Sequence, residues 1–246
     1  MQRTNTTKQD VFLIPGPSKA IFDFSRRHNM RITVPKGSKW WIKSHWHNEK
    51  SSCECVECIQ GQLIVFNYPN SSGGGASGGS EGFRYSFLPV GRHSWSPGDR
   101  EQDLVVVLTA NDILYRNKCS AALDADRFPS LITTPAWLRA LFGLTSWWPP
   151  GYRWLLQQAL WVQFQAIDYA HGYFTLHGAL PVARVWRWFH PFDNRFPDWV
   201  WETQWYSQLM ISRIVECGCF WIGKVVGIRG QYPEYTPQYD QTFEKE

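Results

Sequence analysis

Short strand-like runs separated by turn signals fill the first half of the chain and constrain its fold most. They are rich in β-branched and aromatic residues and cover residues 31–34, 40–47, 53–68, 83–90 and 104–109. Turn-forming sequences separate them, including Pro35-Lys36-Gly37, Gln60-Gly61 and Ser96-Pro97-Gly98-Asp99. Several short strands at this spacing, with no helical period between them, predict a β-sandwich or barrel.

The second half of the chain has the periodicity of amphipathic helices. Apolar residues recur at three- and four-residue spacing over residues 135–144, over 152–171, and from 199 to about 226. We therefore expect a mainly β fold, with a β-barrel over residues 1–116 and an α-helical extension over residues 117–246. A glycine- and serine-rich tract, residues 71–80, lies between two strands and is expected to be a flexible loop.

Charge and hydropathy argue against two classes of partner. The net charge of +4 is small, and basic residues form no run longer than Arg26-Arg27, so no nucleic-acid partner is expected. The most apolar late stretch, residues 209–228, contains Arg213, Glu216 and Lys224. Three charges in this stretch argue against a membrane-spanning helix, whereas a peripheral membrane contact stays open.

The six cysteines are expected to be reduced thiols. The first ten residues are polar and contain no apolar signal-peptide core, so we expect a cytoplasmic location. Cys53, Cys55 and Cys58 are close enough in sequence to suggest a zinc site. Alternation along a strand places Cys53 and Cys55 on the opposite face from Cys58, which favours a packing role instead.

Four residues in the strand-rich half have the chemistry of a metal site. His45 and His47 are two residues apart on one expected strand, so their side chains share a face. Glu54 and His93 come from later strands and add a carboxylate and a third imidazole. These four are the candidate metal ligands, and the three histidines are the candidate catalytic residues.

The order of these residues resembles the two motifs of the cupin superfamily. The first motif of that family is a glycine, a His-x-His pair, a glutamate and, after six intervening residues, a glycine. This sequence has Gly37, His45-Trp46-His47, Glu54 and Gly61, and Pro89-Val90-Gly91-Arg92-His93 is similar to the second motif. The match covers roughly residues 30–112.

The resemblance implies a double-stranded β-helix, or jelly roll, with one divalent metal ion, zinc, iron or manganese, and a homodimer. Six residues separate His47 from Glu54, where the family has three or four. Glu57 and Glu49 therefore stay open as alternative carboxylate ligands, although strand parity places Glu57 opposite Glu54.

Aromatic residues are numerous, with 15 Trp, 15 Phe and 10 Tyr. Such rings can fill a core, and they can also form the flat apolar walls of a pocket for a hydrophobic, polycyclic substrate. Trp40, Trp46 and Trp95 are the candidate pocket residues.

The end of the chain gives a second resemblance. Gly223-Lys224-Val225-Val226-Gly227 and Tyr232-Pro233-Glu234-Tyr235-Thr236-Pro237 are similar to the ending of cupin proteins from fungal secondary-metabolite gene clusters. This favours a natural-product tailoring enzyme. A cyclase or isomerase is the first expectation, because the aromatic content suits shape-selective binding. A non-haem iron dioxygenase and a non-catalytic, ligand-binding cupin are the alternatives.

Overall fold

The computed structural model describes a defined part of the chain. This part comprises residues 4–26, 29–47, 54–68, 75–87, 92–110, 112–124, 159–163, 170–172, 198–225, 227–229, 232 and 234–235. The predicted helix over residues 135–144 lies outside the described residues, as does most of the one over 152–171.

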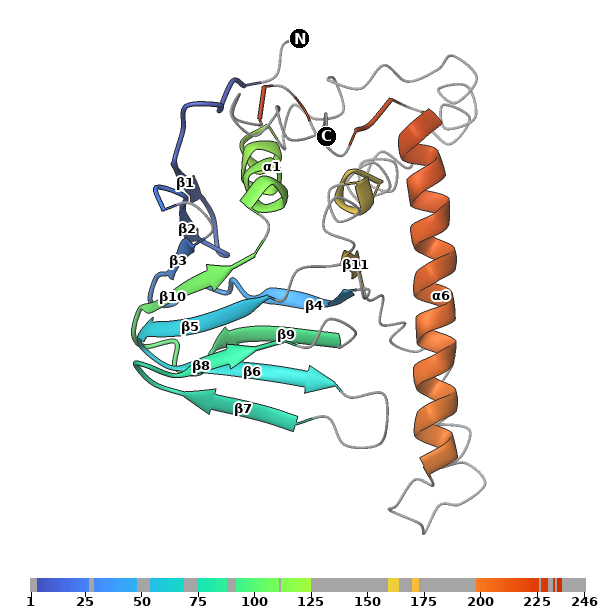
Figure 1. Cartoon of the computed structure of the whole chain (residues 1–246), viewed down its shortest axis with the longest axis horizontal. Coiled ribbons are helices and arrows are strands. Elements are labelled where there is room, and N and C mark those ends of the chain that lie inside the picture. Colours follow the sequence, from blue (N-terminus) through green and yellow to red (C-terminus); the bar gives the residue numbers. More distant parts are fainter. Residues whose placement is uncertain are drawn as a thin grey trace.

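Two antiparallel sheets form the strand-rich half (Figure 1). The larger has the order β1-β2-β3-β10-β5-β8 and the smaller has the order β11-β4-β9-β6-β7. The strands are β1 (Val11–Ile14), β2 (Ala20–Asp23), β3 (Met30–Val34), β4 (Ile42–His47), β5 (Cys55–Gln60), β6 (Leu63–Tyr68), β7 (Gly75–Gly79), β8 (Arg84–Ser86), β9 (Arg92–Pro97), β10 (Leu104–Thr109) and β11 (Ala170–Gly172).

The connection of these strands is that of a jelly roll. From β3 to β10 the chain alternates between the sheets, apart from the β6–β7 hairpin, which gives the orders β3-β10-β5-β8 and β4-β9-β6-β7. The predicted fold class is therefore confirmed: a mainly β jelly roll of the type found in cupins, followed by a C-terminal helix. β1 and β2 extend the larger sheet at one edge, and β11 extends the smaller sheet beside β4.

The core lies between the two sheets and follows the alternation of side chains along each strand. In β3 the residues Met30, Ile32 and Val34 are almost fully buried, while Arg31 between them is exposed. The inward residues of the other strands complete this core, among them Val56, Leu63, Val65, Trp95, Val106 and Leu108.

The glycine-rich tract contains a strand, which corrects the expectation of a flexible loop. Residues 75–79 form β7 and pair with β6, whereas residues 71–74 lie outside the described residues. A Cβ on Gly79 would lie 2.5 Å from the Phe83 ring, and one on Gly78 would lie 3.0 Å from the Leu63 carbonyl oxygen. The glycines therefore permit close approach of neighbouring groups, while the backbone supplies the pairing.

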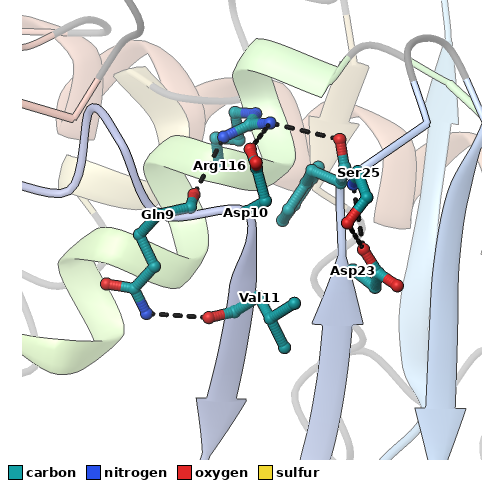
Figure 2. A network of polar contacts seen from close by, with 7 residues as sticks. Gln9, Asp10, Val11, Asp23, Ser25 and Arg116 are labelled. Atoms are coloured by element: carbon teal, nitrogen blue, oxygen red, sulfur yellow. Dashed lines mark hydrogen bonds and ion pairs between the residues drawn. The ribbon is translucent and has the colours of Figure 1, made fainter.

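Helix α1 (Asp112–Leu123) follows β10 and packs on β1. Figure 2 shows the buried Arg116 side chain, which donates hydrogen bonds to the Gln9 carbonyl at 3.0 Å and to the Asp10 carboxylate at 2.9 Å. It also donates to the Phe24 carbonyl at 3.3 Å. The predicted boundary at residue 116 falls inside this helix, and the division into two domains stays a prediction.

Helix α6 (Asp198–Val225) confirms the helix predicted from residue 199. β11 pairs with β4, so the helix predicted over residues 152–171 is wrong at its C-terminal end, although residues 159–163 are helical. α6 contacts β11 and stands at the side of the molecule (Figure 1). No helix in the described ranges is long and apolar enough to cross a membrane.

Candidate metal centre

The candidate ligands lie at one end of the jelly roll because of the strand directions. His45 and His47 end β4, and His93 is the second residue of β9. β4 and β9 are antiparallel, with His45 opposite His93 in the register. Glu54 directly precedes β5, the strand that follows β4 in the sequence. The end of β4 and the beginnings of β5 and β9 therefore bring the predicted set together.

The four side chains converge on one point. The Nε2 atoms of His47 and His93 each lie 3.1 Å from Glu54 Oε2, and His45 Nε2 lies 3.5 Å from the same oxygen. All four residues are buried, and their ligand atoms lie within 4.8 Å of one another. An ion with metal–ligand bonds of about 2.0–2.2 Å separates its ligand atoms by ~3–4 Å. This group can therefore hold one metal ion.

His45 is oriented by its own strand. Its Nδ1 lies 2.9 Å from the Lys43 carbonyl oxygen, which can only accept a hydrogen bond, so the proton is assigned to Nδ1. Burial lowers the pKa of His45 to about 4, although its hydrogen bond with Glu54 acts in the other direction. His45 Nε2 thus points at the Glu54 carboxylate, 3.5 Å away, where a cation could lie between the two atoms.

Glu54 supplies the negative charge of the site. Burial by itself raises the pKa of Glu54, but hydrogen bonding with His45, His47 and His93 outweighs burial and holds that pKa well below its usual range. The side chain is therefore a carboxylate, which is an oxygen ligand for a divalent cation. The donor set, three imidazoles and one carboxylate, fits such a cation.

The structure separates Glu54 from the alternative carboxylate on the same segment. Glu54, Val56 and Cys58 are buried on the inner side of β5, whereas Glu57 is half-buried and lies opposite Arg84 in the register. Glu57 therefore faces away from the cluster, as parity predicted. Glu49 lies outside the described residues.

The cysteines of β5 also divide between its two faces. Cys58 is buried, whereas Cys55 is half-buried and accepts a hydrogen bond from Arg84 Nε at 3.2 Å. The two thiols therefore do not share a zinc site, and Cys53 lies outside the described residues. The described cysteines are free thiols: Cys55, Cys58, Cys119, Cys217 and Cys219.

The three candidate pocket tryptophans fall into two places. Trp95, fully buried two residues after His93, has its ring centroid 5.3 Å from that of Trp40, and both rings belong to the core beneath the cluster. Trp46 alternates with His45 and His47 and has the Arg213 guanidinium of α6 over its ring at 5.3 Å. Trp46 therefore faces α6, and the structure does not bring it beside the other two.

Phe87 is a residue of the site that the sequence reasoning missed. Its ring stacks on His93 with centroids 4.0 Å apart, and its side chain is almost fully buried. The available signal was its position, because Phe87 lies in the strand predicted over residues 83–90, shortly before the segment that contains His93. This stacking fixes the plane of the imidazole.

The strand order and the four converging residues define a jelly-roll protein with a candidate metal centre of three histidines and one glutamate. No protein-family model matches the sequence, and no curated protein matches it. Among solved structures, the chain is similar to the cupin domain of Drosophila melanogaster CENP-C, with 7% identity over 44% of this chain and 81% of that one at a TM-score of 0.31.

Two enzyme structures are similar over comparable stretches. For Lactobacillus farciminis oxalate decarboxylase in a formate complex, identity is 15% over 42% of this chain and 32% of that one, at a TM-score of 0.32. For Fe(II)-HppE with an alternative substrate, identity is 8% over 36% and 48%, at a TM-score of 0.29. The fold assignment accordingly rests on the strand order of this chain, and the site rests on its own four residues.

Proposed function

We propose that the protein is a metal-dependent enzyme that holds one divalent ion at His45, His47, Glu54 and His93 and acts on a hydrophobic small molecule. The observation that carries this proposal is the convergence of three Nε2 atoms on Glu54 Oε2, within 3.5 Å, in a buried site. A buried cluster of three imidazoles and one carboxylate is better explained as a binding site for a cation than as a set of mutual hydrogen bonds.

The number of protein ligands bears on the choice of metal. Four protein ligands complete a tetrahedral zinc site, whereas six-coordinate iron or manganese keeps two positions for other ligands. An ion with open positions supplies a Lewis acid that polarises a substrate oxygen. We therefore favour iron or manganese over zinc.

The protein's own residues would position and shield this site. The Lys43 carbonyl orients His45, and Phe87 stacks on His93, so two of the three imidazoles are fixed by neighbouring groups. Because the cluster is buried, bulk water is largely excluded around it.

The proposed reaction is a cyclisation or isomerisation in natural-product tailoring, of the kind the chain's ending suggests for fungal metabolite pathways. Support comes from the aromatic content of the chain, with 15 Trp, 15 Phe and 10 Tyr, since aromatic walls bind flat apolar substrates at low entropy cost. An oxygen of the substrate would face the three histidines.

A dioxygenase is the second candidate, because the complete set of four ligands suits six-coordinate iron as well as a non-redox role. The mass of the product separates the two. A cyclase or isomerase yields a product with the mass of its substrate, whereas a dioxygenase yields one that has gained two oxygen atoms. A protein that binds the ligand and leaves it unchanged would contradict both.

The metal proposal is tested by the metal content of the purified protein with two matched variants. Glu54→Gln removes the charged ligand, whereas Glu57→Gln makes the same change on the outer face of β5. Wild type and Glu57→Gln are expected to carry about one equivalent of metal, and Glu54→Gln and His47→Ala are expected to lose most of it. The site would be rejected if all four proteins carried the same amount of metal, or if none of them carried any.

Activity is then assayed by expressing the gene with its neighbouring biosynthetic genes and comparing metabolites by mass spectrometry. Replacing wild type with His47→Ala is expected to remove one metabolite and accumulate its precursor. An unchanged metabolite profile with the metal-free variant would contradict a metal-dependent enzyme.

A further inference from the structure

The exposed face of α6 carries large apolar side chains along its whole length. The helix has 28 residues and is about 42 Å long. One face presents a continuous apolar row, hereafter the outer stripe: Trp199, Tyr206, Met210, Ile214, Trp221 and Val225. Their exposed fractions run from 48% to 66%, and their spacing of four and seven residues places them on one side of the helix.

The opposite face of α6 is the packed one, and it combines Val200 and Ile222 with four small or polar residues. Ser212, Glu216, Cys219 and Gly223 are buried there. A Cβ on Gly223 would lie 2.9 Å from Gln163 Nε2, and the same nitrogen donates to the Phe220 carbonyl at 2.9 Å. Small side chains therefore let α6 approach the helical residues 159–163 closely.

The outer stripe departs from the pattern of an ordinary surface helix. Such a helix turns its apolar side inward and its polar side to solvent. In α6, a row of tryptophan, tyrosine, methionine and isoleucine side chains faces outward instead. Exposed apolar rows of this size mark interaction surfaces.

The geometry points to a second copy of this chain as the occupant, with the outer faces of two α6 helices packed antiparallel about a twofold axis at the level of residue 212 along the helix. Residues equally far from position 212 in the two directions then face each other across the interface. The outer stripe must therefore be complementary to a copy of itself that runs in the opposite direction. Trp199 meets Val225 and Met210 meets Ile214 in this arrangement.

The remaining large residues would meet small ones. Tyr206 faces Gly218, where a Cβ would have nothing within 4 Å, and Trp221 faces Thr203, which is exposed. Large side chains opposite small ones interlock without a void or a clash. The outer stripe is therefore complementary to itself.

The area of the outer stripe is appropriate for a dimer. The exposed parts of its six side chains amount to roughly 700 Å² per copy, close to the ~800 Å² per partner of a standard specific interface. The pairing is independent of the proposed enzyme function.

Charge favours a protein partner over a membrane. α6 contains three acidic residues, Asp198, Glu202 and Glu216, and two basic ones, Arg213 and Lys224. Helices that lie on anionic lipid are rich in lysine and arginine. Here Arg213 lies over Trp46, and Lys224 lies 4.6 Å from the Phe220 ring centroid, so both cations contact aromatic rings of the protein.

The dimer is tested by light scattering coupled to size-exclusion chromatography of the full chain. Wild type is expected at twice the chain mass of 28.7 kDa, and Ile214→Glu is expected to run at the mass of one chain. Leu123→Glu is the matched control, since Leu123 is an exposed leucine near the end of α1 that lies outside the stripe. Circular dichroism of each variant checks that the helices remain folded.

A second measurement tests the antiparallel register. Thr203→Cys combined with Trp221→Cys, in a Cys217→Ser background, is expected to give a disulfide-linked dimer on non-reducing gels. The two positions are ~27 Å apart along one helix, so the bond must join two copies. Either single-cysteine variant should give little crosslink.

Three outcomes would overturn the inference. A wild-type monomer at micromolar concentration rejects the dimer, and so does a dimer that persists in Ile214→Glu, because its interface then lies elsewhere. Sedimentation of wild type, but not of Ile214→Glu, with vesicles of mixed neutral and anionic lipid would assign the stripe to a membrane surface instead.

Discussion

One hydrogen bond decides how His45 presents itself to the candidate metal centre. The Lys43 carbonyl accepts a hydrogen bond from His45 Nδ1, so His45 Nε2 faces Glu54. This bond lies within β4 itself and does not depend on the helical half of the chain. The orientation of the first imidazole is therefore a local property of the strand.

The grouping of the four candidate ligands could be predicted from sequence because parity is a strong constraint. His45 and His47 had to share a face, and Glu54 and Glu57 had to lie on opposite ones, as the structure has them. Spacing alone left the choice of carboxylate open. Glu54 stands just before β5 rather than within it.

Aromatic contacts of the site were less predictable. Trp46 lies between two ligands in the sequence but faces α6, and Phe87, which the sequence did not single out, stacks on His93. Which ring contacts an imidazole depends on how the two sheets pack. That information is absent from the local pattern of residues.

The cysteines give a prediction at the residue scale. Burial raises the pKa of the Cys119 thiol far above its ordinary value, and Cys217 is exposed on the outer face of α6. In the monomeric Ile214→Glu variant, iodoacetamide at mildly alkaline pH is expected to modify Cys217 and leave Cys119 unmodified, as read by peptide mass spectrometry. Modification of Cys119 at the rate of Cys217 would contradict the described burial, and full reaction of both in guanidinium is the control.

At the scale of elements, the longest periodic segment was found and several short strands were missed. The period of α6 continues over 28 residues, and its predicted beginning differs from the observed one by a single residue. β10 was predicted with its observed bounds because five of its six residues are leucine or valine. β1 and β2, with four residues each, were not predicted. The turn signal Pro15-Gly16-Pro17 between them was available in the sequence.

β7 and β11 could not be predicted, for two different reasons. β7 is made of Gly, Ala and Ser, so it has no side-chain pattern, and its pairing with β6 is entirely a matter of the backbone. β11 has three residues within a stretch of helical period, and its pairing with β4 is a tertiary contact that outweighs local preference.

The close approach at β7 makes a prediction with a built-in control. Gly79→Ala would place a Cβ 2.5 Å from the Phe83 ring, whereas Gly75→Ala meets nothing within 4 Å. Gly79→Ala is expected to lower the free energy of unfolding by about 1–3 kcal/mol because the ring must shift. Gly75→Ala should change it by less than ~0.5 kcal/mol. Urea denaturation of both variants measures the difference, and equal effects would show that the Phe83 contact is unimportant.

Residues 234 and 235 join the segment that begins at Thr4 to Asp124, which directly follows α1. Tyr235 is fully buried and its hydroxyl donates to the buried Asp124 carboxylate at 2.7 Å. Thr4 also bonds to Asp124, and the Glu234 carbonyl accepts from the Thr6 backbone at 2.9 Å. The tyrosines of this ending, which suggested a protein class from sequence, therefore have a structural role here.

Tyr235→Phe tests that role by removing only the hydroxyl. One hydrogen bond to a buried carboxylate is lost, so the free energy of unfolding is expected to fall by about 1–3 kcal/mol, measured by urea denaturation. Metal content should not change, because Tyr235 lies outside the cluster of four ligands. A stability equal to that of wild type would mean that water replaces the hydroxyl without loss.

At the scale of the whole molecule, the described residues connect the candidate metal centre with α6 through β11 and Trp46. β11 pairs with β4 at the positions of His45, Trp46 and His47, and α6 contacts β11. Arg213 of α6 lies over Trp46, on the opposite side of β4 from the cluster. The sheet therefore separates the proposed ion from the proposed dimer surface.

This separation predicts that the two properties can be removed one at a time. Chelation of the metal with EDTA is expected to lower the melting temperature, because the ion binds only the folded chain, while the scattering mass stays that of a dimer. Ile214→Glu is expected to halve the scattering mass while the metal content stays near one equivalent. Metal content and scattering mass are measured on both wild type and Ile214→Glu, so each measurement serves as a control for the other.

Loss of the dimer on chelation would show that the ion and α6 are coupled through β11 and Trp46, contrary to the separation described. Loss of metal from Ile214→Glu would show the same coupling from the other side. If neither protein held metal but wild type were dimeric, the enzyme proposal would fail and the outer stripe would still be an interface. The reverse result would leave the metal centre intact and reject the pairing of α6, so each proposal can fail without the other.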